Sequence, residues 1–238
     1  MDRAFLDGLP MPSGGLDGPA ATRCTAPMTL AHRLSCAQGR RDQGPNKRLA
    51  AELAGRGDEA GVAELVELSD AGTLRQRRDA ILVLHAVGER RPELLAPHLD
   101  ELVDLLEDDD NRMLWSVLLT VRTVTGVAPV GVMEYLGPIL DAAERSSVIA
   151  RDATVKMLVE LAAEADPYEV VAPHLLRLVR TAATNQFPTY ATRAAGCLRD
   201  DDLPQLVALI EARDDLDAFP AKRRNMDKLL RRIAKRIG

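Results

Sequence analysis

A short proline-leucine motif recurs along the chain and constrains its fold more than any other feature. The tetrapeptide Ala96-Pro97-His98-Leu99 has related copies that begin at residues 137, 172 and 203. The four prolines are 41, 35 and 31 residues apart. Self-similarity with a period of this size is the signature of stacked structural repeats.

Each copy of the motif predicts the start of an amphipathic helix. Proline is tolerated in the first turn of a helix, because the N–H that it lacks has no intrahelical partner there. Positions two, five and six after the proline share one helix face and are apolar, except for Glu144. These positions are Leu99, Leu102 and Val103; Leu140 and Ala143; Leu175, Leu178 and Val179; and Leu206, Leu209 and Ile210. Val62, Leu65 and Val66 form an earlier copy without proline.

A second helix precedes each of these. Arg78-Asp79-Ala80 recurs as Arg151-Asp152-Ala153, with Arg112 at the same point between them. Polar turns such as residues 108–111 separate the units and offer N-cap oxygens. The unit is therefore helix A, turn, helix B, turn. A single pair cannot bury its apolar stripe, so the pairs must stack. The expected buried columns of helix A are Ala80, Leu114 and Ala153, and Leu84, Leu118 and Met157.

Composition agrees with an all-α fold. Aromatic residues make up only 3%, which argues against a sheet protein and against a site built on base stacking. Three cysteines cannot form a closed disulfide framework, and no apolar run approaches the roughly 20 residues of a membrane span. We therefore expect a cytoplasmic protein.

The stretch from Leu95 to Arg112 resembles the second helix and following turn of a HEAT repeat, through Pro97, Leu99, Leu102 and Asp108-Asp109. The resemblance covers about residues 46–212. It implies a right-handed α-α superhelix of about five helix pairs, whose B helices line a concave surface. We place this solenoid at residues 46–219, followed by a capping helix at 220–238. The family implies a scaffold or adaptor rather than a particular activity.

The first 45 residues differ in composition from the body. They hold five prolines and six glycines without periodicity. Such a segment buries too little apolar surface to offset its ordering entropy, so we expect it to lack fixed structure. Its removal is then expected to leave thermal stability unchanged. An alternative is that Met28 is the true start.

No pattern in the sequence predicts catalysis, a cofactor or a metal. His98 and His174 occupy the same repeat slot, so repeat identity explains them better than a paired site. Cys24, His32 and Cys36 lack zinc-ligand spacing. Trp115, the single tryptophan, is expected to pack in the core or between repeats. We therefore expect a protein that is not an enzyme.

Charge on the B helices indicates a binding surface. The solvent-facing positions are acidic in the first three units and basic in the fourth. An equal alternative is that these charges serve only to solvate the helix face, because any exposed helix face is charged. We expect this face to receive a basic or amphipathic segment of another protein. The candidate residues are Glu64, Glu67, Asp100, Glu101, Asp104, Asp141, Arg177 and Arg180.

Basic residues gather at the carboxyl end. Residues 221–238 carry +7 and residues 1–48 carry +3 of a total of −5, so the middle carries −15. Met226, Leu229, Leu230, Ile233 and Ile237 form one helix face, which favours a terminal cap. The alternative is a docking element for an acidic partner, a nucleic acid or an anionic membrane. Its contacts would be Lys228, Arg231, Arg232, Lys235 and Arg236.

The tail also supports an alternative function. The chain would then be a nucleic-acid-associated HEAT-like protein, a degenerate relative of a DNA glycosylase, anchored by its basic helix. We favour the scaffold, because an acidic surface repels phosphate.

Overall fold

The computed structural model describes residues 30–164 and 166–238, and within these ranges all regular structure is helical. The prediction of an all-α chain is confirmed for this part. Short 3-10 turns flank several helices, among them η1 (Ala31–Arg33), η5 (Asp200–Asp202) and η6 (Asp214–Leu216). The α-helices are α1 (Gly44–Arg56), α2 (Glu59–Ala71), α3 (Leu74–Gly88), α4 (Leu99–Asp104), α5 (Asn111–Val124), α6 (Pro129–Glu134), α7 (Leu136–Arg145), α8 (Val148–Leu161), α9 (Tyr168–Arg180), α10 (Phe187–Cys197), α11 (Leu203–Glu211) and α12 (Pro220–Ile237).

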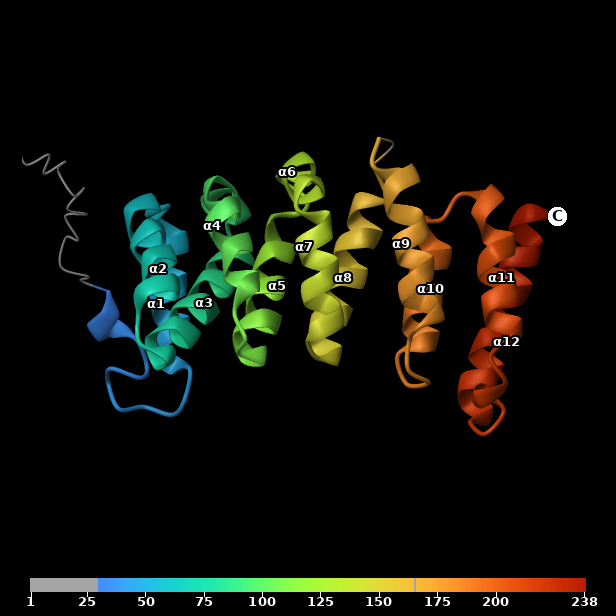
Figure 1. Ribbon diagram of the computed structural model, residues 1–238, viewed down its shortest axis with the longest axis horizontal. Helices are drawn as coiled ribbons and strands as arrows, with labels where there is room; N and C mark the ends of the chain where they lie inside the picture. Colours follow the sequence, from blue (N-terminus) through green and yellow to red (C-terminus); the bar gives the residue numbers. More distant parts are fainter. Residues whose placement is uncertain (1–29, 165) are drawn as a thin grey trace, which may run out of the picture.

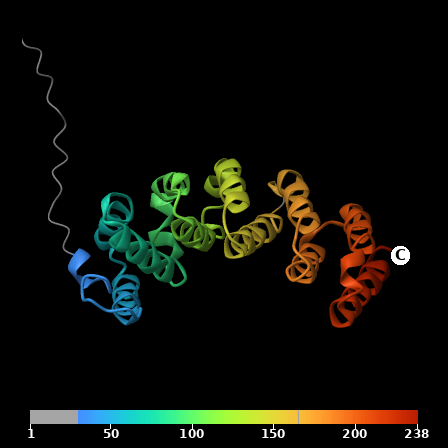
Figure 2. The ribbon, with the colours of Figure 1, turned by 60° about the horizontal axis from the view of Figure 1, so that its bottom comes forward.

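The helices stand side by side along the long axis of the molecule (Figure 1). Figure 2 shows them in two rows: α1, α3, α5, α8, α10 and α12 form one row, and α2, α4, α7, α9 and α11 form the other. We call these the A row and the B row. Along the A row, α3 packs against α1 and α5, α5 packs against α8, and α10 packs against α8 and α12.

The two rows bow together in Figure 2, and the B row follows the outer side of the bow. The HEAT resemblance implies the opposite, with B helices on the inner side. The candidate binding residues therefore belong to helices along the outer side of the bow, and not to a concave inner surface.

Polar contacts join each unit to the next. Arg77 pairs with Asp108, 31 residues away, at 2.5 Å, and Arg145 donates to the Leu106 carbonyl, 39 residues away, at 2.9 Å. These separations match the 31 to 41 residues between the repeated prolines. The sequence period is thus also the period of the contacts.

The turn at residues 108–111 caps a helix, as its sequence predicts. The Asp110 carboxylate accepts a hydrogen bond from the Met113 N–H at 2.9 Å at the start of α5. It also pairs with Arg78 on α3, and this hydrogen bond lowers the pKa of Asp110. One side chain therefore caps α5 and ties it to the preceding unit.

The predicted apolar stripes are buried. In α4 the side chains of Leu99, Leu102 and Val103 are at most 5% exposed, and the corresponding residues of α9 are also buried. The predicted A-helix columns, Ala80, Leu114, Ala153, Leu84, Leu118 and Met157, are all buried. Leu209 is the exception in α11, where it is half-buried. Trp115 packs half-buried against the core.

The predicted place of proline is correct at three of the four positions. Pro97 lies in the 3-10 turn before α4, and Pro138 and Pro204 lie in the first turns of α7 and α11. Pro173 instead lies inside α9, because α9 begins five residues earlier, at Tyr168. The buried Tyr168 explains the early start: its hydroxyl donates to Asp202 and accepts from the Arg199 N–H at 2.7 Å.

Residues 30–45 differ from the expectation of an unstructured head. Leu34 is fully buried, and the Ser35 N–H donates to Asn46 Oδ1 at 2.9 Å. The Cys36 N–H donates to Asp79 Oδ2 at 2.8 Å, and Arg33 pairs with Glu52. This segment packs because helices α1 and α3 supply acceptors for its backbone, which composition does not reveal. The rest of the head, residues 1–29, lies outside the described residues.

Deletion tests this packing. We expect a variant lacking residues 1–43 to melt about 4 °C or more below one lacking residues 1–29, because it loses the buried Leu34 and three buried or half-buried polar contacts. Thermal unfolding by circular dichroism measures the difference. Equal melting temperatures would show that residues 30–43 contribute nothing to stability.

Candidate functional site

The candidate residues on the B helices all lie in the B row. Glu64 and Glu67 are on α2, Asp100, Glu101 and Asp104 on α4, Asp141 on α7, and Arg177 and Arg180 on α9. Exposure divides them: Glu64 and Arg177 are half-buried, whereas the other six are exposed. We call the surface formed by these eight residues the B-helix face.

Glu64 has a structural partner. Its carboxylate accepts a hydrogen bond from the Leu30 N–H, so it fastens the head segment to α2. Glu67, one turn further along α2, is exposed. The acidic part of the face that is open to a partner therefore begins at Glu67.

The acidic centre of the B-helix face is α4 together with the residues around Tyr135. Tyr135 lies between α6 and α7 and donates a hydrogen bond to Asp100. This bond and burial, with smaller contributions from the negative charges of Asp100, Glu134 and Asp104, raise the pKa of the Tyr135 phenol. Sequence reasoning missed Tyr135 and Glu134, since α6 is an extra helix outside the repeat pattern.

Glu101 differs from its neighbours in having a nearby histidine. His98 Nδ1 lies 3.5 Å from Glu101 Oε1, one turn away in sequence. Asp104 and Asp141 form no ion pair with any residue that the structure describes. The centre of the face thus keeps unneutralised carboxylates.

The basic end of the face is on α9. Arg177 pairs with Glu144 on α7, so it is partly neutralised and links two successive B helices. Glu144 was the one polar departure from the predicted stripe, and this pair explains it. Arg180 is exposed, and within the described residues it has no ion-pair partner. Arg180 is therefore the available positive charge.

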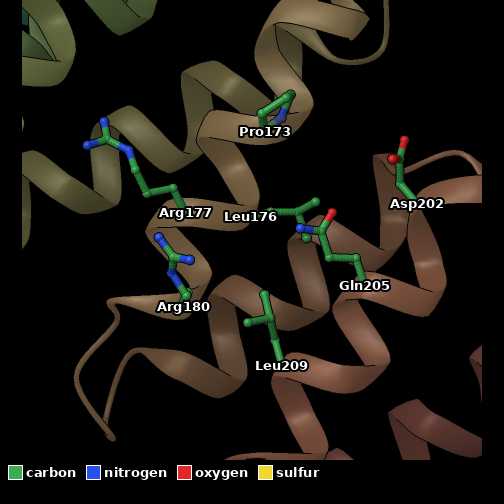
Figure 3. A pocket seen from close by; sticks show the side chains of 7 residues that line it. All are labelled: Pro173, Leu176, Arg177, Arg180, Asp202, Gln205 and Leu209. Carbon is green, nitrogen blue, oxygen red and sulfur yellow. The ribbon is translucent and has the colours of Figure 1, made fainter.

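A hollow of about 150 Å³ lies beside these arginines, between α9 and α11. In Figure 3, Leu176, Gln205 and Leu209 occupy its centre, Arg177 and Arg180 lie along one side, and Asp202 lies on the other. The Asp202 carboxylate accepts a hydrogen bond from the Tyr168 hydroxyl, and burial together with this bond raises the pKa of Tyr168 to about 12. Gln205 and Leu209 follow Pro204 in the fourth motif copy, but no sequence pattern indicates that they border a hollow.

The carboxyl-terminal helix α12 covers the end of the two rows. Met226, Leu229 and Ile233 are 1%, 4% and 3% exposed and pack with α10 and α11. Two members of the predicted apolar face differ, because Leu230 is half-buried and Ile237 is 43% exposed. The packing is that of a cap.

All five predicted basic contacts are exposed on α12, and four of them form no ion pair within the described residues: Lys228, Arg231, Arg232 and Lys235. Arg236 is different, because it pairs with Asp200 at 2.7 Å and donates to the carbonyls of Ala195 and Leu198. These carbonyls lie at the end of α10, where they have no intrahelical donors. The charge pattern predicts that Arg236 contacts an anionic partner. In the structure it instead fastens α12 to the end of α10.

Comparisons with known proteins identify no relative. No family model matches the chain, and neither the curated proteins nor the solved structures contain a match. Within the described residues, no group of three or more histidine, cysteine, aspartate or glutamate side chains is placed to hold a metal ion. No helix in that part of the chain is long and apolar enough to cross a membrane.

Proposed function

We propose that this chain is a non-catalytic scaffold that binds a basic or amphipathic segment of another protein on its B-helix face. We further propose that its helix pairs are HEAT-like and form a right-handed superhelix. The alternation of A and B helices and the polar contacts one repeat apart support this assignment.

One observation carries the proposal: the exposed, unneutralised carboxylates on α4 and its neighbours. Asp100 and Asp104 lie one turn apart on α4, and Asp141 lies on the next B helix. Exposed charges of one sign on adjacent helices attract a partner of the opposite sign and speed its association. A segment that carries lysine or arginine therefore complements this face.

The nucleic-acid alternative has weaker support. Exposed cations occur on α12, but the −15 charge of residues 49–220 opposes the approach of a long phosphate chain. The acidic centre of the B-helix face, around Asp100 and Asp104, would add to this repulsion. A protein partner avoids this conflict.

Charge reversal tests the scaffold proposal. We expect the triple variant Asp100→Lys, Glu101→Lys, Asp104→Lys to lose partner capture from an extract of the native organism, as read by mass spectrometry. The side chains are exposed, so the variant should fold, with a cost of about 0.5 kcal/mol for each substitution. Circular dichroism checks the fold.

A matched control carries the same change of charge elsewhere. Asp201→Lys, Glu211→Lys, Asp214→Lys alters three exposed residues near the carboxyl end. It should capture the same partner as the wild type. Recovery of that partner by the α4 variant would reject the B-helix face as the binding site.

A further inference from the structure

We propose that the hollow between α10 and α12, with the basic stripe beside it, binds a short acidic segment of a partner protein. This surface is separate from the B-helix face, because both helices belong to the A row. The proposal does not depend on the function proposed above.

The basic stripe consists of exposed cations on one side of α12. Four of them are separated by four, three and four residues, and the fifth directly follows the third of these four. This spacing places all five along one helix face. The stripe spans twelve residues, and its first and last Cα atoms are about 16 Å apart. Within the described structure none of them forms an ion pair. The stripe residues are Arg224, Lys228, Arg231, Arg232 and Lys235.

The other cations of α12 are engaged, which sets the stripe apart. Arg223 lies near Asp217 and Asp227, at 3.7 and 3.5 Å. Lys222 contacts Asn185 and lies over the ring of Phe219. Arg236 holds the end of α10. The fold therefore uses three cations and leaves five unneutralised.

The hollow lies beside the stripe and can hold one side chain of a bound peptide. Its volume is about 340 Å³, and Lys228 and Arg232 contribute to its wall from α12. Thr189 and Thr192 line it from α10, and Asn225 adds an amide. The apolar residues that border it are Pro188, Met226 and Leu229. A glutamate side chain matches this lining, because its carboxylate meets cations and polar groups while its methylenes meet apolar atoms.

Two observations argue against a membrane as the occupant. Insertion needs an unpartnered apolar face, but Met226, Leu229 and Ile233 are buried against the helix rows. The exposed apolar residues near this helix, Phe219 and Ile237, lie at its opposite ends and form no continuous face.

Two further observations argue against nucleic acid. Among the described residues, no aromatic side chain lines the hollow, so unpaired bases would find no stacking surface there. Two exposed acids, Asp200 and Asp217, lie against α12, where they contact Arg236 and Arg223. They would repel a polyanion longer than the stripe, whereas a short acidic peptide fits within it.

Binding of a defined probe tests the proposal. The probe is a fluorescein-labelled 14-residue peptide with glutamates at helix positions one, five, eight and twelve, measured by fluorescence anisotropy at low salt. We expect saturable binding that weakens as salt rises. The variant Lys228→Glu, Arg232→Glu should weaken binding about tenfold or more, because attraction becomes repulsion.

A matched variant controls for net charge. Lys47→Glu, Arg48→Glu changes the charge equally at exposed positions of α1 and should bind within about twofold of the wild type. The α4 triple reversal should not weaken peptide binding, so failure of this proposal is separate from failure of the scaffold proposal. Amide chemical shifts of Thr189 and Asn225 should change on titration.

Three outcomes would overturn the proposal. They are failure of the wild type to bind the peptide, binding by the hollow variant as tight as that of the wild type, and tighter binding of another anion. The competitors are a 20-base-pair DNA duplex and vesicles containing phosphatidylserine. Tighter binding of either competitor, lost in the hollow variant, would assign the stripe to that class of partner instead.

Discussion

Removing residues 220–238 is expected to lower the melting temperature by about 10 °C or more. Met226, Leu229 and Ile233 are buried, and full burial of such side chains contributes about 1.5–3 kcal/mol each. For a chain of this size, 1 kcal/mol corresponds to about 2–4 °C. The deletion also exposes the carbonyls at the end of α10 that Arg236 binds. Differential scanning calorimetry measures the shift.

A charge variant separates capping from docking. Replacing Lys228, Arg231, Arg232 and Lys235 with glutamine keeps the buried face of α12 and should change the melting temperature by less than about 2 °C. It should nevertheless lose binding of the acidic peptide. A deletion variant as stable as the wild type would show that α12 is not a cap.

Gly88→Ala is expected to destabilise the protein by about 1–3 kcal/mol, the usual cost of overpacking. Gly88 ends α3 where this helix lies against α5. A Cβ atom there would stand 2.1 Å from Thr123 Oγ1 and 2.7 Å from Leu95 Cδ1. Thr123 Cβ, at 2.9 Å, prevents relief by a simple side-chain rotation. Urea unfolding measures the free energy difference.

Gly55→Ala is the matched control. Gly55 lies in α1, and a Cβ atom there meets nothing within 4 Å. Because glycine weakens a helix relative to alanine, this substitution should stabilise the protein by about 0.5–1 kcal/mol. If both variants are equally stable, the close approach of α3 and α5 is not a constraint on the fold.

The candidate site was only partly predictable. Asp100, Glu101 and Asp104 were found because the repeat pattern shows which side of α4 is not buried. Tyr135 was missed because it lies beside α6, which interrupts the repeat. The charge pattern predicts Glu64 and Arg236 as partner contacts, but within the chain they bind the Leu30 N–H and Asp200, each more than 30 residues away.

The sequence by itself determined the helices and their buried faces. These properties depend on residues three and four positions apart, so the pattern around Leu99, Leu102 and Val103 is sufficient to predict them. Even the size of the unit followed from the prolines, because each helix pair repeats the same local chemistry.

Only the tertiary structure decided how the units meet. The direction of the bow, the packing of Leu34 and the early start of α9 depend on contacts between residues in different units. The same holds for the surface charges: within the part of the chain that the structure describes, Arg177 forms an ion pair and Arg180 does not, although both are arginines on one helix. Whether a charge finds a partner depends on the angle and distance between neighbouring helices, and these are set by the packing of side chains far apart in the sequence.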